Sequence, residues 1–382
     1  MKRSTDRILT THVGSLPRPA DLLAMNTAKA TGQSYDENAW KARVRTAVTE
    51  VVRKQAETGL DVIDDGELSK PNWSGYVMDR LTGFEPGAGT QRYGGGLDRR
   101  NFSEFYDEYE RIQPFRQPLF GANAVCKGPV SYKGQALLQM DIDNLKAAAA
   151  QVKAQELFMP SVAPGSLVSR RNEYYKTEEA YLTALADAMK TEYKAIVDAG
   201  FILSLDDPGI VVGYDRGDTL MDPEQYRKRI MPRIEALNHA LKGIPEDRVR
   251  YHVCWGGWHG PHSTDFPLKE LMPVILKARV GGYLIEAGNA RHEHEWRAWK
   301  DVKMPEGRIL MPGVVSHATN VIEHPELVAE RIVRFANILG RENIIASTDC
   351  GMGGRVHYQI AWAKLASLAE GAKLATRELW KN

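Results

Sequence analysis

Residues 249–258 read Val-Arg-Tyr-His-Val-Cys-Trp-Gly-Gly-Trp, a strand pattern that ends in metal-binding chemistry. Val249, Tyr251 and Val253 stand at alternate positions, which is typical of a short β-strand. His252 and Cys254 then point to one side, because residues i and i+2 of a strand share a face. An imidazole and a thiol on one side, at the end of a strand, make half of a tetrahedral metal site.

Short apolar runs of this kind alternate with longer helical patterns along the 382 residues. Helical patterns cover 39–59, 177–200, 325–340 and 358–380, and the first three close on a glycine, which suits a helix end. Alternation on this scale predicts a parallel α/β fold, a (β/α)8 TIM barrel with inserted loops. The candidate strands are 10–15, 61–65, 123–130, 157–162, 201–206, 249–254, 282–286, 309–315 and 343–348.

These nine strands are one more than a barrel needs, so either 123–130 or 157–162 is expected to be a side hairpin or an inserted strand. No Gly-x-Gly-x-x-Gly follows the first strand, which makes a doubly wound dinucleotide fold the weaker choice. No repeat or low-complexity linker divides the chain, so we expect one catalytic barrel domain over 1–382. A glycine-rich, aromatic insertion at about 87–117 breaks the rhythm, as a lid, a subunit contact or a passive surface loop would.

The bulk composition narrows the class of protein. Lys plus Arg number 50 and Asp plus Glu number 49, without a basic cluster, which argues against a nucleic-acid partner. No apolar run is long enough to span a membrane, and the first residues are polar, so we expect a cytoplasmic protein. The three cysteines are far apart and do not suggest disulfides. Cys126 is expected only to pack in the core.

Polar residues end several predicted strands, and in a barrel these C-terminal ends form the active-site face. Glu286 ends the strand after the one that carries His252 and Cys254, and Cys350 follows the last strand. One imidazole, two thiolates and one carboxylate favour Zn²⁺ over Mg²⁺ or Ca²⁺. The other polar strand ends contain His12, Gly14, Ser15, residues 64–67, Asp206 and Asp207.

Seven short motifs, taken in chain order, resemble the catalytic C-terminal barrel of the cobalamin-independent methionine synthase family. The chain therefore looks like a short single-domain relative in that family. Together the motifs extend over nearly the whole chain, so the ordered set is specific even though each piece is short. The motifs are TTHVGSLP at 10–17, DVIDDGE at 61–67, GPV at 128–130, SLDDP at 204–208, HVC at 252–254, IE at 285–286 and DCG at 349–351.

The resemblance implies a zinc-dependent methyltransferase of methionine biosynthesis, with a small-molecule thiol as acceptor and a methyl or alkyl donor. Carried over to this chain, the zinc ligands are His252, Cys254, Glu286 and Cys350. A thiol is mostly protonated at neutral pH, and zinc coordination converts it into the nucleophilic thiolate. The metal also fixes the direction in which the sulfur points toward the donor.

The acceptor side of the family's site also has counterparts here. In the family, homocysteine lies against the Gly-Ser turn, and an acidic pair holds its amino group. The similar positions are Gly14 and Ser15 for the turn and Glu67 and Asp206 for the pair. His12 belongs to the first-strand motif and completes the predicted substrate-binding set.

The chain departs from methionine synthase on the donor side. The segment 260–265 delays Glu286, and residues 131–133 lack the tryptophan associated with folate. His317 resembles the family's proton-handling histidine shifted by one place, and it is the predicted catalytic residue. The donor could therefore be a methylfolate or a simpler compound, and a homo-oligomer is compatible with the sequence.

Two other functions stay open. The first is a zinc-dependent epoxyalkane–coenzyme M transferase, in which a sulfonate would need an arginine such as Arg99, Arg100 or Arg291. The second is a zinc-binding protein without catalysis, which would not need the acidic pair. A second metal site at His292 and His294 is not expected, because on a helix they face different directions; we expect a solvated helix start there.

Overall fold

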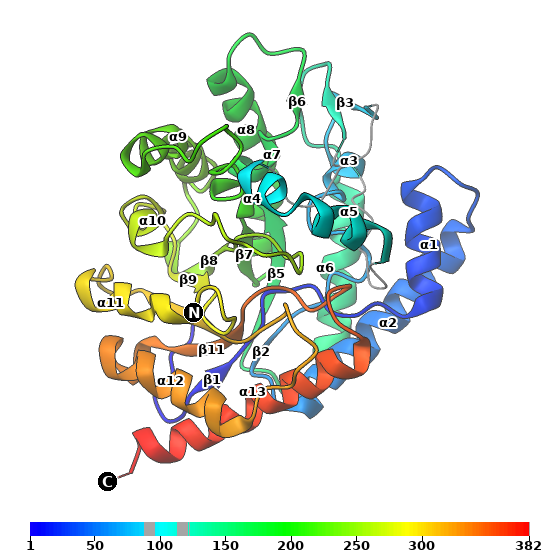
Figure 1. Cartoon of the computed structure of the whole chain (residues 1–382). Helices are drawn as coiled ribbons and strands as arrows, with labels where there is room; N and C mark the ends of the chain where they lie inside the picture. Colours follow the sequence, from blue (N-terminus) through cyan, green and yellow to red (C-terminus); the bar gives the residue numbers. More distant parts are fainter. Residues whose placement is uncertain (88–95, 113–120, 122, 382) are drawn as a thin grey trace.

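The computed structural model describes residues 1–87, 96–112, 121 and 123–381. Eight parallel strands form one sheet in the order β1-β11-β10-β9-β8-β7-β5-β2 (Figure 1). Between its two edge strands, the Asp61 amide donates to the Thr10 carbonyl at 3.1 Å, so the sheet nearly closes into the predicted TIM barrel. The strands are β1 Leu9–Thr10, β2 Val62–Ile63, β5 Glu156–Val162, β7 Ile202–Asp206, β8 Val249–Val253, β9 Gly282–Ile285, β10 Ile309–Val315 and β11 Ile345–Thr348.

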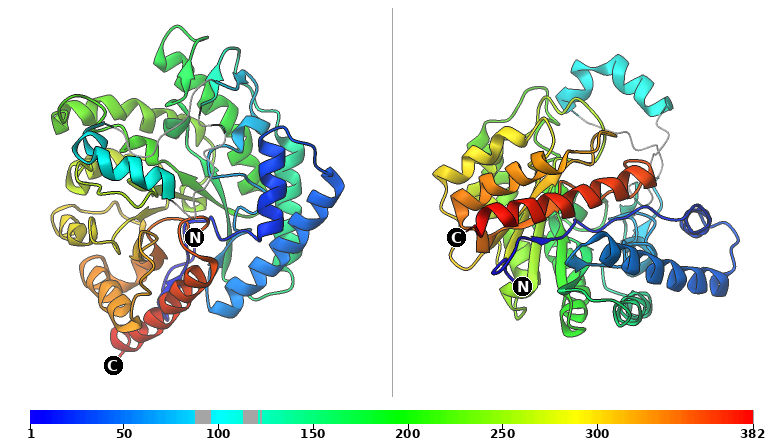
Figure 2. Two further views of the ribbon diagram at one scale, coloured as in Figure 1. Left: turned by 45° about the vertical axis from the view of Figure 1, so that its right-hand side comes forward. Right: turned by 90° about the horizontal axis from the view of Figure 1, so that it is seen from below.

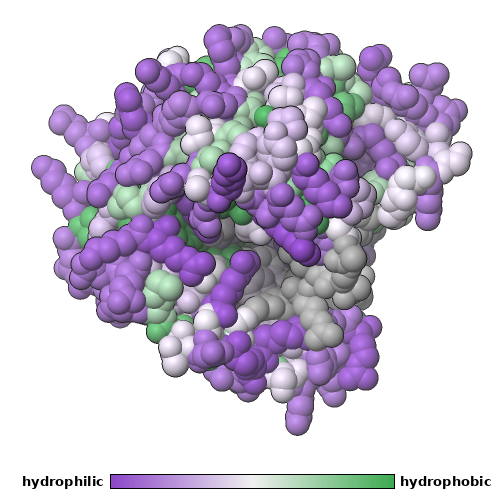
Figure 3. Space-filling view, turned by 90° about the horizontal axis from the view of Figure 1, so that it is seen from above, coloured by the Kyte–Doolittle hydropathy of each residue, from purple (hydrophilic) through white to green (hydrophobic). Residues whose placement is uncertain are grey.

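Helices surround the strands, as both views in Figure 2 show. No helix in the described ranges is long and apolar enough to cross a membrane. On the face shown in Figure 3, hydrophilic residues predominate and hydrophobic ones gather only in small patches. The helices are α1 Ala20–Ala30, α2 Glu37–Thr58, α3 Val77–Arg80, α4 Gly96–Asn101, α5 Ser103–Ile112, α6 Gln135–Ala149, α7 Pro164–Leu167, α8 Glu178–Asp198, α9 Pro223–Ala240, α10 Leu268–Ile275, α11 Ala298–Asp301, α12 Pro325–Leu339 and α13 Tyr358–Leu379.

The four helical patterns of the sequence correspond to α2, α8, α12 and α13, with ends within two residues of those predicted. Local chemistry explains the agreement for α2. The Asp36 carboxylate accepts hydrogen bonds from the amides of Asn38 and Ala39, which otherwise lack helical partners. Gly59 ends the helix at φ 93°, in the left-handed region that favours glycine.

The surplus ninth strand is 123–130. Only Val125–Cys126 of this range forms a strand, β4, which lies in a side sheet with β3 (Phe84–Glu85) and β6 (Arg171–Asn172). β4 pairs antiparallel with β3, whereas all the barrel strands are parallel. Cys126 is fully buried there, which confirms the packing role predicted for it.

The strand register sets the level of the site residues inside the barrel. Asp206 of β7 pairs with His252 of β8, and Val253 pairs with Ile285 of β9. Cys254 and Glu286 therefore follow neighbouring strands at the same height. Arg250 lies one pleat below His252 on the inner face, because side chains alternate along a strand.

The insertion predicted at about 87–117 lies partly outside the described residues. Its described part forms α4 and α5. In the right-hand view of Figure 2 this pair of helices lies above the body of the barrel, away from the N-terminus. The structure therefore places α4 and α5 on the side of the barrel that carries the C-terminal strand ends.

Candidate metal centre and active site

Three of the predicted metal ligands meet at the C-terminal end of the barrel. One ligand atom each from His252, Cys254 and Cys350 lies within 4.8 Å of the others, and the two sulfur atoms are 3.9 Å apart. The Cys254 thiol and the His252 ring beside Cys350 lower its pKa well below the usual thiol value, against the effect of burial. A lowered pKa favours the thiolate form of Cys350, the form that binds metals.

His252 provides the clearest test of whether this cluster suits a metal. The residue is 2% exposed, and neither of its ring nitrogens has a hydrogen-bond partner among the described residues. A buried imidazole without partners is costly, and a metal ion would satisfy one of its nitrogens. Together with two thiols, this is the donor set of a zinc site.

Glu286, the fourth predicted ligand, lies beside this triad and belongs to a second group with His317 and Asp349, again within 4.8 Å. Its carboxylate accepts hydrogen bonds from the Trp255 amide at 2.9 Å and the Asn289 side chain at 2.7 Å. Burial raises its pKa well above the usual value, with charges on Asp349 and Cys350 adding to the effect. Metal ligation by Glu286 remains a prediction.

Asp349 and Asn289 hold the surroundings of Glu286, and the sequence assigned them no role. Asp349 is fully buried, and it accepts the amides of Ala287 and Gly288, both at 2.8 Å, and the Asn289 side chain at 3.0 Å. It therefore fixes the loop that follows Glu286. The sequence could have indicated a role for Asp349, since Asp349 is the first residue of the DCG motif.

His317 lies where the sequence predicted a catalytic histidine, next to the metal ligands. It is 2% exposed, and its Nδ1 has no partner within the described chain. Burial lowers its pKa to about 3, and the positive charge of Arg355 acts in the same direction. The imidazole is therefore neutral at physiological pH.

The acidic pair predicted to bind the acceptor faces the same centre. Glu67 is 1% exposed and Asp206 is 6% exposed, and one oxygen of each has no partner among the described residues. Burial raises the pKa of Asp206 to about 8; nearby Glu67 and Cys350 add to this, and His252 opposes it. Two buried acids with open oxygens can bind an ammonium group.

Gly14 and Ser15 form the turn beside these acids. A Cβ added to Gly14 would lie 2.8 Å from Glu67 Oε1, so only glycine lets the backbone pass this carboxylate. The Ser15 carbonyl accepts the amides of Met352 and Gly353, which joins the turn to the Cys350 loop. These contacts bring the predicted turn against both the acidic pair and the metal centre.

Arg18 fixes this turn, although the sequence assigned it no role. Its guanidinium donates to Ser15 Oγ at 3.3 Å, the Glu67 carbonyl at 2.7 Å and the Lys70 carbonyl at 3.0 Å. It thus positions the turn and Glu67, both of which are predicted to bind the acceptor. In the sequence, only its position three residues after Ser15 could have indicated this role of Arg18.

The described contacts of His12 are with the barrel wall. Its Nε2 pairs with Gln55 at 2.7 Å and lies 3.4 Å from Asp64, and its ring packs edge-on against Phe158. Burial lowers its pKa to about 3, so the ring is neutral. Contact with a substrate remains a prediction for His12.

The insertion and the segment 260–265 contact each other. The Asp98 carboxylate of α4 accepts the amide and hydroxyl of Ser263 at 2.8 and 2.5 Å, and the hydroxyl of Tyr106 at 2.6 Å. Tyr106 in turn accepts the Trp258 indole N–H at 3.0 Å. The two features that depart from a plain barrel therefore build one structure next to the loop that begins at Cys254.

The expectation of a solvated helix start at His292 was wrong. His292 is 3% exposed and lies between Asp265 at 3.0 Å and Glu295 at 2.8 Å, while its ring stacks on Trp255. Burial alone would lower its pKa, but these two carboxylates raise it to about 10. Tertiary packing of the loops around β8 and β9 created this environment, and His294 is exposed as expected.

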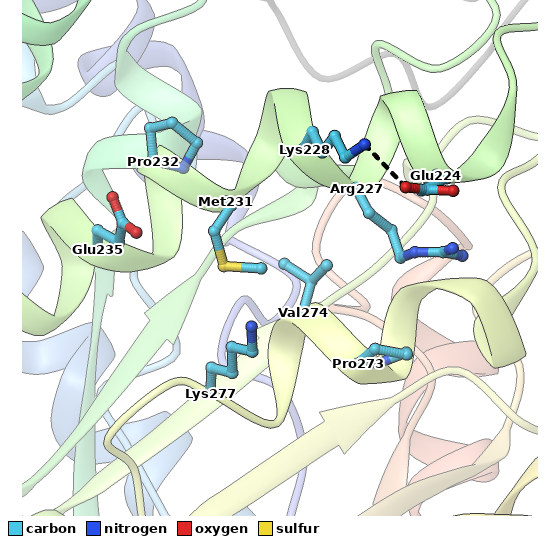
Figure 4. A pocket seen from close by; sticks show the side chains of 9 residues that line it. All are labelled: Glu224, Arg227, Lys228, Met231, Pro232, Glu235, Pro273, Val274 and Lys277. Atoms are coloured by element: carbon cyan, nitrogen blue, oxygen red, sulfur yellow. Dashed lines mark ion pairs between the residues drawn. The ribbon is translucent and has the colours of Figure 1, made fainter.

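A further groove, of about 460 Å³, lies on the outside of the barrel between α9 and α10. Figure 4 shows its charged rim, where Lys228 pairs with Glu224 at 2.7 Å. None of the predicted site residues lines it. It is therefore separate from the metal centre.

Comparisons with known proteins agree with this geometry. A model of the catalytic domain of cobalamin-independent synthases matches residues 8–91. Methionine synthases of Sulfurisphaera tokodaii and Thermococcus kodakarensis are 26% and 24% identical, each over 97% of this chain and 93% and 94% of their own.

Solved structures share the fold. A B12-independent methionine synthase from Shewanella sp. W3-18-1, solved with selenomethionine, superposes with a TM-score of 0.74 at 19% identity, covering 98% of this chain and 99% of that one. A putative vitamin-B12-independent methionine synthase from Listeria monocytogenes gives 0.67 at 18% identity, covering 98% and 100%. The family match over residues 8–91, the end-to-end likeness to methionine synthases and the shared barrel make this chain similar to the enzymes of the cobalamin-independent methionine synthase family.

Proposed function

We propose that this enzyme transfers a methyl group to a thiol in a zinc-dependent reaction, with homocysteine or a similar amino thiol as acceptor. The observation that carries the proposal is the group of buried His252 and Cys254 with half-buried Cys350, in which both imidazole nitrogens lack other partners among the described residues. The relatives named methionine synthase, which match the chain nearly end to end, support the reaction class. A cytoplasmic location, a single domain and a homo-oligomer stay predictions of the sequence.

Two sets of residues have separate roles in this proposal: one would hold the metal, and the other would bind the acceptor. A zinc ion held by His252, Cys254 and Cys350, with Glu286 beside them, would supply a Lewis acid that keeps the acceptor sulfur ionised. Glu67 and Asp206 can hold the acceptor's ammonium group, which fixes the direction of the sulfur.

His317 has a different role in this proposal. Its neutral ring and open Nδ1 can hydrogen-bond to the group that leaves the donor. The Asp98–Ser263–Tyr106 structure lies on the same side of the barrel and can restrict access of water to the site. The donor is proposed to be a methylfolate or a simpler methyl compound.

The geometry disfavours the coenzyme M alternative as first framed. Arg99 pairs with Asp107 and Glu110 within the insertion, Arg100 donates to the Gly217 carbonyl, and exposed Arg291 donates to the Ser263 carbonyl. The acceptor side instead presents two acids, which repel a sulfonate. The same acids would have no use in a zinc-storage protein.

Metal analysis and two cysteine variants test the proposal. Purified protein should contain about one zinc per chain, the stoichiometry of a single four-ligand site. Cys350→Ser should lose the metal and reduce homocysteine methylation at least roughly 100-fold, since even outer-shell partners of a metal are worth up to that factor. Cys126→Ser, the matched control in the side sheet, should keep both.

Two results would contradict the proposal. Full methyltransfer by protein freed of zinc would remove the role of the metal. Equal loss of zinc in Cys350→Ser and Cys126→Ser would show that Cys350 is not a ligand. Zinc can be measured by plasma mass spectrometry and methionine by chromatography.

A further inference from the structure

Arg355 lies at the rim of the metal centre, on the loop between Cys350 and α13. A Cβ added to Gly257 would lie 2.7 Å from Arg355 Cζ and 2.8 Å from Nη2, so the guanidinium lies flat against this glycine. Gly257 follows Cys254 by three residues. The guanidinium therefore bridges the two loops that carry the predicted thiolate ligands.

Among the described residues, this guanidinium has no anion to pair with. Within the described ranges, no carboxylate or carbonyl oxygen lies within hydrogen-bond or ion-pair distance of it, and only its backbone amide is engaged, by the Met352 carbonyl at 3.3 Å. The internal ranges 88–95 and 113–120 and residue 122 contain no Asp or Glu in their sequence. Arg355 is nevertheless partly buried, and a partly buried arginine is normally paired.

We propose that Arg355 binds the anionic group of the alkyl donor and so determines which donors the enzyme accepts. The planar fork of an arginine matches a carboxylate, sulfonate or phosphate with two parallel hydrogen bonds. The inference rests on the proposed thiol alkyl transfer and extends it to the donor class, which is an anionic methyl or alkyl compound.

The position of Arg355 favours the donor over the acceptor. The guanidinium lies against Gly257, two residues before His259, and His259 Nε2 lies 3.0 Å from the His317 carbonyl. The charge of Arg355 accordingly acts on both histidines. In an amino acid the carboxylate shares a carbon with the amino group, so an acceptor held by Glu67 and Asp206 keeps its own carboxylate on their side. An anion beside His317 therefore belongs to the second substrate.

The test compares Arg355→Gln and Arg355→Lys with Arg291→Gln, an exposed arginine on the neighbouring loop. The protein as purified is treated with iodoacetate or iodoacetamide, which differ in charge but share the reacting carbon, and labelling of Cys350 is followed by mass spectrometry. Buried Cys126 serves as a monitor of unfolding. Steady-state KM values are then measured for homocysteine and for 5-methyltetrahydrofolate.

Arg355→Gln should lower the iodoacetate-to-iodoacetamide rate ratio at Cys350 roughly tenfold, the usual worth of a charged hydrogen bond. It should raise the KM for 5-methyltetrahydrofolate by a similar factor and leave the KM for homocysteine within about twofold. Arg355→Lys should fall between, because it keeps the charge without the fork. Arg291→Gln should match the wild type.

An unchanged labelling ratio in Arg355→Gln overturns the inference. A rise confined to the KM of the acceptor, whether homocysteine or coenzyme M, also overturns the inference, because Arg355 would then bind the anionic group of the acceptor. If no form methylates homocysteine, the proposed reaction fails. The labelling ratio then still decides whether Arg355 attracts an anion to the centre, so the two failures are distinguishable.

Discussion

His292 shows how a single residue is defined by its surroundings. Its ring lies between Asp265 and Glu295 and stacks on Trp255, whose amide hydrogen-bonds to Glu286. A protonated ring satisfies both carboxylates, and its burial prevents water from replacing them. His292 therefore supports the wall of the metal pocket without contacting the predicted ligands in a hydrogen bond.

This environment predicts a pH-dependent contribution to stability. The folded pKa of His292 is raised to about 10, above the unfolded value of 6.5, so the folded protein binds the proton more tightly. The contribution is complete below about pH 6.5 and is lost as the pH rises through about 10. Between those limits, His292→Gln should lower the free energy of unfolding by an amount that shrinks with pH, on the order of a few kcal/mol at the acid end.

Urea unfolding at a series of pH values measures this difference. His294→Gln is the matched control, because His294 lies two residues away and is exposed. A wild-type-minus-variant difference that stays constant from pH 6.5 to 10 would mean that His292 is not the titrating group.

At the scale of elements, α4 and α5 act on the loop after β8. The Asp98 carboxylate receives three hydrogen bonds, two from Ser263 and one from Tyr106, while Tyr109 accepts the His259 amide at 2.7 Å. A Cβ on Gly96 would clash with the Asp215 carbonyl, so the start of α4 also packs closely on the loop after β7. The insertion is thus attached to two site loops.

Removal of the Asp98 charge should loosen this attachment. Asp98→Asn should speed amide hydrogen exchange in residues 259–265 roughly tenfold or more, because charged hydrogen bonds are worth more than neutral ones. Zinc content should not change, since Asp98 contacts no predicted ligand. Glu104→Gln, an exposed acid on α5, is the control and should exchange like the wild type; equal exchange in Asp98→Asn would refute the attachment.

At the scale of the whole molecule, Arg250 ties strands together inside the barrel. Its guanidinium donates to Ser204 Oγ on β7 and, beyond β1, to Thr11 Oγ1 and the His12 carbonyl, all within 2.9 Å. It lies 3.4 Å from the centre of the Phe158 ring. Burial lowers its pKa to about 9, and the acids Asp64 and Asp206 keep it charged at neutral pH.

Arg250→Met should therefore destabilise the fold substantially. The change leaves several buried acceptors without their donor and removes the buried positive charge near Asp64 and Asp206, a loss of about 3–5 kcal/mol in the free energy of unfolding. Arg248→Met, on the same strand entry but donating to the Gly200 carbonyl near the surface, should change it by less than about 0.5 kcal/mol. Similar urea midpoints for the two variants would exclude a tie across the barrel.

The sequence by itself determined the barrel, the four long helices and the grouping of His252, Cys254 and Cys350. These depend on local signals: helix caps such as Asp36, alternation in 249–253, and polar residues at strand ends, which parallel topology must bring to one face. The strand 123–130 could not be excluded in advance, because an apolar run has the same pattern in a side sheet as in a barrel.

Only the tertiary structure decided the surroundings of the site. The burial of His292, the attachment of Asp98 to Ser263, and the unpaired guanidinium of Arg355 against Gly257 join residues far apart in the chain. The periodicity of apolar residues in the sequence does not predict such contacts, because they depend on how loops from different strands pack over the barrel end. The pattern of residues thus predicts which side chains gather at the proposed metal centre, whereas loop packing decides the surroundings of the proposed donor side.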